Sequence, residues 1–340
     1  MHSPRAGRCE RAEVEAELRD TETLRQCAES IVPTIVGAHV PIVRVQRGRS
    51  DYSSCYASDI VTVTLTTGDE LTIFLKNFSS FRHPEDRMAQ RRQREICVYR
   101  DLLAQADLGT ARYYGSVWDE SPGRFWLLLE FVNGTPVCSC DFDGWLAAAS
   151  WLGGMHGYFA QHIDEVRACT VLVRHNAPFF HSTATRALQV LSNRSPELAG
   201  RLAPIAKRYK NVVDVMVIQP PTLVHGAYRA EDVLLDIRTQ PTRICPVDWE
   251  VAAIGSGLYD LAVLVDGFEP PRLDQLFDAY RRAAMRCGME VPYWGDMKYL
   301  VDCFRLHRVM TWISKADQRN YPRSVEEKLV NVAEQVNRLV

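Results

Sequence analysis

The segment LVHGAYRAEDVLLD, residues 223–236, decides the fold and the chemistry that this chain can be expected to have. A short apolar run leads into His225-Gly226, and a second apolar run follows Asp232. Further along, ICPVD brings another short strand-like run to an end at Asp248. An acid after one strand is most often a turn former, but this ordered loop-strand-strand unit is more specific. Because magnesium prefers carboxylate oxygens, Asp248 is a candidate metal ligand.

The sequence before this unit predicts a small antiparallel sheet. Residues 41–48 and 59–77 read as strands, and β-branched runs flank Thr67-Gly68-Asp69, which is a hairpin signal. We therefore expect a three-stranded meander to open the chain. Residues 85–106 have helical periodicity with a basic face. Two further strands are predicted at 111–119 and 124–132.

Gly134 and Pro136 interrupt the pattern, and beyond residue 141 the chain is predicted to be mainly helical. We predict an α+β fold with two lobes: a small sheet lobe at 1–133 with one helix after the third strand, and a larger, mainly helical lobe at 134–340. The predicted helices of the second lobe are 143–162, 184–216, 272–288 and 295–340, with strands only around 222–249.

Composition narrows the possible partners. The chain has 40 Lys and Arg against 42 Asp and Glu, a formal charge of -2, so no positive field favours nucleic acid or an anionic membrane. Its 10 cysteines form no CxxC pair that would indicate a zinc site. Residues 1–20 are charged and lack the apolar core of a signal peptide, and no apolar run has the length of a membrane span. We expect a cytoplasmic protein.

The predicted elements follow the order of the protein-kinase-like fold. In that order, five strands with a helix after the third are followed by helices and then by the loop-strand-strand unit. Lys76 ends the third predicted strand and Glu95 lies on the following helix, where a lysine that holds nucleotide phosphates and its orienting carboxylate would lie. Taken alone, Lys76 is also compatible with an ordinary strand-end lysine and Glu95 with a solvated helix residue. The chain contains no HExxH, G-x-S-x-G or Walker motif.

LVHGAYRAEDVLLD and ICPVDWEVAAIGSGLYDLAVL together resemble the aminoglycoside phosphotransferase and choline kinase group. Members of this group typically show His-Gly-Asp, four residues, Asn, and later Asp-Trp-Glu and Tyr-Asp-Leu-Ala. The resemblance covers about residues 41–270. It implies a phosphotransferase that uses ATP and Mg²⁺ and phosphorylates a hydroxyl of a small molecule or peptide. The lobe at 1–133 would bind the nucleotide, and the lobe at 134–340 would carry the catalytic and metal-binding loops.

The resemblance also implies a role for each matched position. Lys76 and Glu95 would anchor the phosphates, and Asp232 and Asp248 would hold magnesium. Asp260 would be a structural acid of the second lobe. The hinge that bonds the adenine edge through backbone groups would be Glu130, Phe131 and Val132, and the catalytic loop would contain His225 and Ala227.

Three positions depart from the family pattern. Ala227 replaces the catalytic acid, Asp232 replaces the usual Asn, and residues 46–59 lack a regular glycine-rich loop. Aspartate keeps an oxygen ligand, and a serine-rich turn still offers backbone N–H groups to phosphate. Alanine accepts no proton, which removes a contribution of typically about 10²- to 10⁴-fold. Phosphoryl transfer depends mostly on positioning and electrostatics, so we expect turnover to be slowed rather than abolished.

Three interpretations of Ala227 are open at this stage. The chain is a slow phosphotransferase; or it is a pseudokinase that binds a nucleotide or a partner without efficient transfer; or Ala227 is an introduced substitution in an active enzyme. Glu231 and Glu250 are candidates to replace the missing acid, although each is more typical of a solvated acid.

Overall fold

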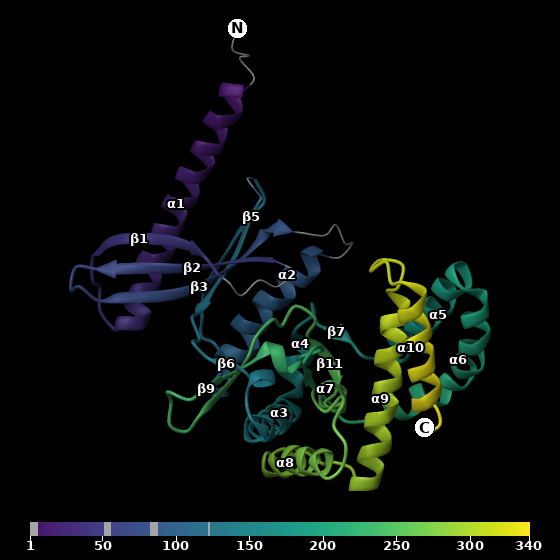
Figure 1. The fold of residues 1–340 in the computed structure, drawn as a ribbon. Coiled ribbons are helices and arrows are strands. Elements are labelled where there is room, and N and C mark those ends of the chain that lie inside the picture. The colour runs from purple at the N-terminus through teal and green to yellow at the C-terminus, as the bar shows by residue number, and fades with distance from the viewer. Residues whose placement is uncertain (1–5, 51–55, 82–87, 122) are drawn as a thin grey trace. The chain divides into compact units, whose positions relative to one another are not determined.

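The computed structural model describes residues 6–50, 56–81, 88–121 and 123–340 (Figure 1). The chain divides into two compact units, residues 1–92 with 111–132 and residues 93–110 with 133–340. The serine-rich turn that we expected to approach phosphate lies partly outside the described residues. Each unit is described by itself below.

The first unit contains a five-stranded antiparallel sheet with the order β1-β2-β3-β5-β4. The predicted hairpin at Thr67-Gly68-Asp69 is confirmed: the Leu65 amide donates to the Asp69 carbonyl oxygen at 2.9 Å, and Gly68 has a φ of 89°. The strands are β1 (Ile42–Arg49), β2 (Tyr56–Leu65), β3 (Glu70–Phe81), β4 (Tyr113–Asp119) and β5 (Arg124–Glu130).

A helix, α1 (Ala6–Val36), precedes this sheet, so the prediction that a meander opens the chain is wrong. In the part of α1 whose side chains the structure describes, Leu24, Ala28, Ile31 and Val32 form an apolar stripe that is buried with sheet residues in one hydrophobic cluster. Arg124 of β5 also donates to the Asp20 carboxylate of α1 at 2.8 Å. The charged N-terminal half of the segment hides this pattern from a sequence-based prediction.

The second unit is mainly helical. The helix predicted at 85–106 is α2 (Met88–Cys97), which belongs to this unit from Gln93 onward and continues through a π-helical turn (Val98–Leu102) to Gln105. The single helix predicted at 184–216 is two helices, because the chain leaves the helical conformation at Ser195, before Pro196. The helices after α2 are α3 (Phe142–Gln161), α4 (Ile163–Ala168), α5 (Ala177–Arg194), α6 (Pro196–Val217), α7 (Leu258–Leu264), α8 (Arg272–Arg286), α9 (Trp294–Ser314) and α10 (Arg323–Val336).

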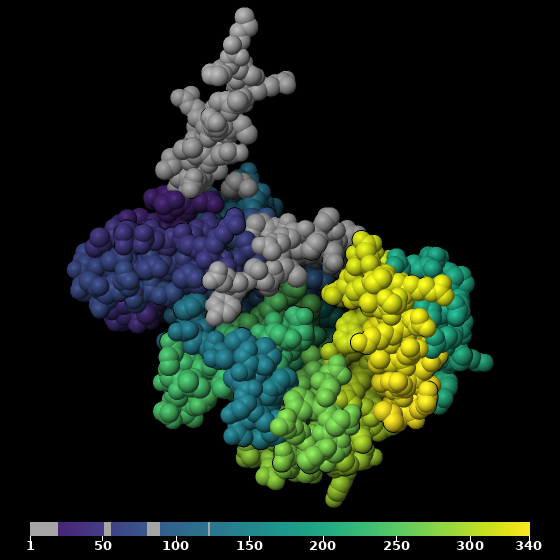
Figure 2. Space-filling view, in the orientation of Figure 1, coloured from purple at the N-terminus to yellow at the C-terminus, as the bar shows by residue number. Residues whose placement is uncertain are grey.

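Close helix packing forms the body of this unit. α3 approaches α8 so closely that a Cβ at Gly153 would overlap the backbone carbonyl of Tyr280. The α9–α10 pair, yellow-green to yellow, lies beside the teal α5–α6 pair (Figures 1 and 2). Within the described part of the chain, no helix is long and apolar enough to cross a membrane.

This unit also contains two small sheets, with the orders β10-β9-β6 and β7-β11-β8. Their strands flank the loops that contain Ala227 and Asp248. The expectation that strands of this lobe lie only around 222–249 is therefore incomplete, because β6, β7 and β11 lie outside that range and are too short to give a pattern. The strands are β6 (Thr135–Pro136), β7 (Val173–Arg174), β8 (Pro221–Val224), β9 (Val233–Asp236), β10 (Arg243–Pro246) and β11 (Ala253–Ser256).

A buried histidine in this unit makes stability depend on pH. His307 of α9 is 0% exposed, and burial lowers its pKa to about 3; burial also lowers the pKa of His175 to about 4. Both values lie below that of an unfolded histidine, about 6.5, so the unfolded chain takes up protons first as the pH falls. The stability that these residues contribute is present above pH 6.5 and is lost as the pH falls, down to about 4 for His175 and about 3 for His307.

We therefore predict that the free energy of unfolding falls by about 2 kcal/mol from pH 6.5 to pH 5 because of His307 alone. Urea unfolding of wild type and His307→Gln at both pH values measures this term, because glutamine does not titrate. His39→Gln, at an exposed position, is the control. A pH dependence that is the same in wild type and His307→Gln would contradict the prediction.

Candidate active site

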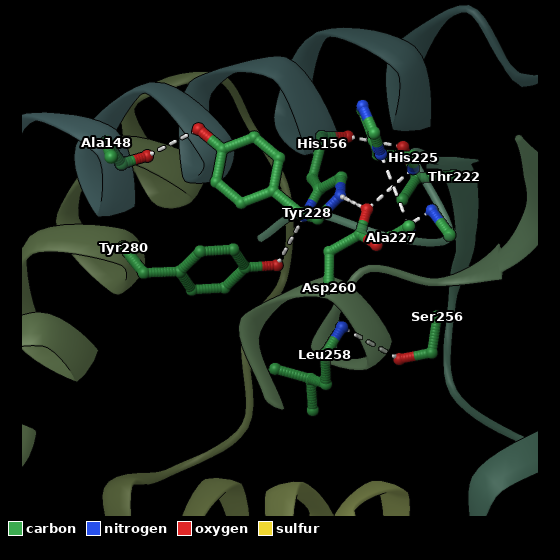
Figure 3. A network of polar contacts seen from close by, with 11 residues as sticks. Ala148, His156, Thr222, His225, Ala227, Tyr228, Ser256, Leu258, Asp260 and Tyr280 are labelled. Atoms are coloured by element: carbon green, nitrogen blue, oxygen red, sulfur yellow. Dashed lines mark hydrogen bonds and ion pairs between the residues drawn. The ribbon is translucent and has the colours of Figure 1, made fainter. Parts of the chain in front are cut away.

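The loop after β8 is fastened at its base by one buried carboxylate (Figure 3). Asp260, in the first turn of α7, is 0% exposed. Its Oδ2 accepts from the His225 amide at 2.6 Å and its Oδ1 from the Gly226 amide at 2.9 Å. Asp260 thus has the structural role that the sequence predicted: it fixes the backbone that presents Ala227.

A second layer of polar groups holds Asp260 in turn. His156 of α3, 0% exposed, places Nε2 3.4 Å from the Asp260 carboxylate and Nδ1 3.0 Å from the hydroxyl of Tyr280. Burial and the nearby Asp260 charge raise the pKa of Tyr280, so its hydroxyl remains protonated and can donate to Nδ1. His156 then donates from Nε2 to Asp260. The sequence pattern did not indicate this network, because His156, Asp260 and Tyr280 lie far apart in the chain.

Both ring nitrogens of His225 are hydrogen-bonded to backbone groups. Its Nε2 lies 2.9 Å from the Val247 carbonyl oxygen, and its Nδ1 accepts from the Ala227 amide at 3.3 Å. The ring ties the loop to the residue preceding Asp248.

Backbone geometry on either side of the site is unusual. Gly226 has a φ of 83°, and a Cβ there would overlap the Val251 carbonyl, so this position needs glycine. Asp248 has a φ of 69°, a left-handed conformation that costs a non-glycine residue on the order of 1–3 kcal/mol. Such a conformation persists only where surrounding bonds enforce it.

Ala227 and Asp232 occupy a short turn between β8 and β9. Ala227 is half-buried, and its carbonyl accepts from the Arg229 amide at 2.7 Å. The Asp232 carboxylate accepts from Arg229 Nε and Nη2 at 2.9 and 2.8 Å. Burial raises the pKa of Asp232, Arg229 opposes this shift, and the nearby charge of Asp248 adds to it. The Asp232 carbonyl also accepts from the Val247 amide at 2.9 Å, which links the two loops.

Carboxylates gather around Asp248 in a different set from the one predicted. Glu95, Asp248 and Glu250 each bring one oxygen within 4.8 Å of the others, whereas Asp232 does not belong to this group. Glu95 and Glu250 are 1% and 7% exposed, so the interpretation of either residue as a solvated acid is wrong. Glu231 is exposed, as expected. Three carboxylates this close suit a hard divalent cation such as Mg²⁺.

The remaining predicted residues lie in the first unit. Lys76 does not end its strand, because β3 continues to Phe81; it pairs across the sheet with Ser58 and Leu127. It is 4% exposed, so it is not an ordinary strand-end lysine. Its Nζ lies 5.3 Å from the ring centre of Tyr56 and 5.6 Å from that of Phe78.

The predicted hinge residues follow the same sheet. Glu130 ends β5, and its carboxylate accepts from the Arg112 amide at 3.1 Å. The Glu130 amide donates to the Arg112 carbonyl at 2.9 Å, which closes this end of the strand pair. Phe131 is half-buried and Val132 is buried in the connection that follows.

Comparison with known proteins gives one family and one fold. Residues 61–299 match the model of the phosphotransferase enzyme family, APH. The GDP complex of a variant of aminoglycoside 2'-phosphotransferase-IIIa covers 90% of this chain and 95% of its own at 15% identity, with a TM-score of 0.59. Macrolide 2'-phosphotransferase from Brachybacterium faecium covers 89% and 98% at 14% identity, with a TM-score of 0.56. No curated protein matches the sequence. The predicted kinase-like fold, with its antiparallel sheet and mainly helical second part, is confirmed.

Proposed function

Because the chain belongs to the phosphotransferase enzyme family, we propose that it transfers the γ-phosphoryl group of ATP, with Mg²⁺, to a hydroxyl of a small molecule. The main support for this proposal is that the loop after β8 is held in place by hydrogen bonds and is bonded to the segment that contains Asp248. Asp260 fixes the backbone at His225 and Gly226, and the same loop is bonded through His225 to the segment that presents Asp248. Such positioning is what phosphoryl transfer chiefly requires.

In this proposal Asp248 would hold the magnesium ion. Asp232, the second predicted ligand, lies outside the group of Glu95, Asp248 and Glu250 and is bonded to Arg229, so it would have to share that bond to reach the ion. When bound, the ion neutralises charge that develops on the phosphates. Lys76 contributes a further positive charge to the triphosphate. The backbone of Glu130, Phe131 and Val132 bonds the adenine edge.

The chemical step forms a bond between the acceptor oxygen and the γ-phosphorus and breaks the bond from that phosphorus to the oxygen of the leaving ADP. The hydroxyl proton must also leave. The methyl group of Ala227 cannot accept it, so the proton passes to water or to the transferred phosphoryl oxygens. This favours a slow transfer, since a positioned base contributes typically about 10²- to 10⁴-fold.

A pseudokinase is the second candidate, and Ala227 is the observation that favours it. The fold would then be retained for binding a nucleotide or a partner. The two candidates share nucleotide binding and differ in transfer, so binding and transfer have to be measured separately.

Nucleotide binding is tested first through Lys76. We predict that Lys76→Met weakens ATP affinity at least about tenfold in the presence of Mg²⁺, equivalent to 1.4 kcal/mol, because methionine keeps the packing against Tyr56 and Phe78 but lacks the charge. Lys207→Met, at an exposed position on α6, is the matched control. Calorimetry gives both affinities.

The same titration is run with GTP, because one of the compared structures is a GDP complex. Unchanged affinity of Lys76→Met for both nucleotides would count against the proposed function.

A further inference from the structure

The part of α2 that carries Glu95 belongs to the second unit. Residues 93–110 group with the helices and loops that contain Ala227 and Asp248. The contacts that hold this part of α2 therefore decide whether Glu95 stays with Asp248. The residue next to Glu95 provides two of these contacts.

Arg94 spans two neighbouring chain segments. It is 7% exposed; its Nε donates to the Val171 carbonyl oxygen at 2.7 Å, and its Nη1 donates to the Glu250 carbonyl oxygen at 2.6 Å. Val171 lies two residues before β7, and Glu250 lies three residues before β11. These strands run parallel, with Val173 opposite Ala253, so both carbonyls lie at the same end of adjacent strands. A planar guanidinium can bridge them.

The bond to Glu250 acts on the turn that contains Asp248. The left-handed conformation of Asp248 has to be enforced by its surroundings. The turn is closed internally by the Ala252 amide, which donates to the Trp249 carbonyl at 3.1 Å, and externally by Arg94 at the residue between them. Arg94 thus joins the helix of Glu95 to the turn of Asp248.

Electrostatics acts in the same direction. The carboxylates of Glu95, Asp248 and Glu250 approach within 4.8 Å of one another, and like charges at this distance repel. A buried guanidinium bonded to the backbone of Glu250 places positive charge beside the cluster. This positive charge opposes the mutual repulsion of carboxylates that lie so close together.

We propose that Arg94 is a positioning residue that keeps Glu95 and Asp248 in one body before nucleotide or metal binds. It follows that the acid cluster is already assembled in the ligand-free chain. The consequence for metal and nucleotide rests on the function proposed above, whereas the mechanical role of Arg94 does not.

The mechanical role is tested by hydrogen–deuterium exchange of the ligand-free chain. In Arg94→Met, amides in residues 93–105 and in residues 247–252 should both exchange at least about tenfold faster, because local opening of the two segments is no longer prevented. Arg100→Met is the matched control, since Arg100 is 50% exposed and pairs with its neighbour Asp101. Unchanged exchange at residues 247–252 would overturn the proposal.

The variant Arg94→Lys tests whether the planar guanidinium or only the positive charge is needed. It also serves as a second variant if Arg94→Met folds poorly. Lysine keeps the positive charge but cannot span both carbonyls with a planar group. We expect faster exchange in both segments, as in Arg94→Met. Exchange restored to the wild-type rate by lysine would contradict the bridging role.

The functional consequence is measured by titrating ATP with and without Mg²⁺. Arg94→Met should reduce the gain in affinity that Mg²⁺ provides by at least about tenfold, while metal-free affinity changes less than about twofold. An equal fall in both affinities would show a general structural effect and overturn the positioning role. If wild type shows no Mg²⁺-dependent binding, the proposed function fails, and the exchange experiment still decides the role of Arg94.

Discussion

Replacing Ala227 with aspartate should raise the single-turnover rate of phosphoryl transfer by about 10²- to 10⁴-fold, the contribution typical of a positioned base. The backbone at this position is already fixed, because Asp260 bonds the two preceding amides and His225 bonds the amide of Ala227 itself. The side chain is half-buried, so a carboxylate would not face the cost of full burial. The new acid would be available to the acceptor hydroxyl.

Ala227→Asn is the matched control, because asparagine has the size of aspartate but does not accept a proton at neutral pH. Loss of labelled γ-phosphate is followed for wild type and both variants. A rise for Asp and none for Asn identifies the missing base as the reason for slow transfer. Equal rates for all three, with ATP bound tightly by each, would favour the pseudokinase.

Replacing Asp248 with asparagine should lower Mg²⁺-dependent transfer by at least about 100-fold, because the amide offers one neutral oxygen where the metal is proposed to meet a charged carboxylate. Metal-free nucleotide binding should change little. The measurement is the transfer rate across a Mg²⁺ titration. An unaltered requirement for Mg²⁺ at an unaltered rate would refute the assignment of Asp248.

Asp260→Asn is the comparison for this experiment. Its carboxylate accepts two backbone N–H bonds and contacts His156, so the variant should lose about 2 kcal/mol or more of unfolding free energy. Its dependence on Mg²⁺ should match that of wild type, because Asp260 is not proposed to touch the ion. Equal loss of metal dependence in the two variants would contradict the division of roles.

The sheet could be predicted from the sequence because its signals are local. The turn at Thr67-Gly68-Asp69 and the β-branched runs beside it specify a hairpin without reference to the rest of the chain. The helix α1 was missed because the many charged residues of segment 1–20 obscure the apolar stripe around Leu24 and Ile31 that follows them. The break at Ser195 was missed because apolar periodicity continues through it.

The candidate site was predicted only as far as its residues follow one another in the chain. Asp248 was recognised by its place after a short predicted strand, and Asp260 by the family resemblance of the segment around it. The grouping of Glu95 with Glu250 depends on tertiary packing, and burial rather than sequence excludes a solvated role for either. The bonds of His156 to Asp260 and Tyr280 likewise join three helices that no local pattern relates.

The most direct test of the account is whether the unaltered chain transfers phosphate. Wild type is incubated in excess over ATP labelled at the γ-position, with Mg²⁺ and a panel of aminoglycosides, nucleosides and hydroxylated peptides, and with GTP in parallel. We predict slow appearance of label on at least one acceptor, abolished in Asp248→Asn. Tight binding of nucleotide with no label on any acceptor, in wild type and in Ala227→Asp alike, would contradict the phosphotransferase account.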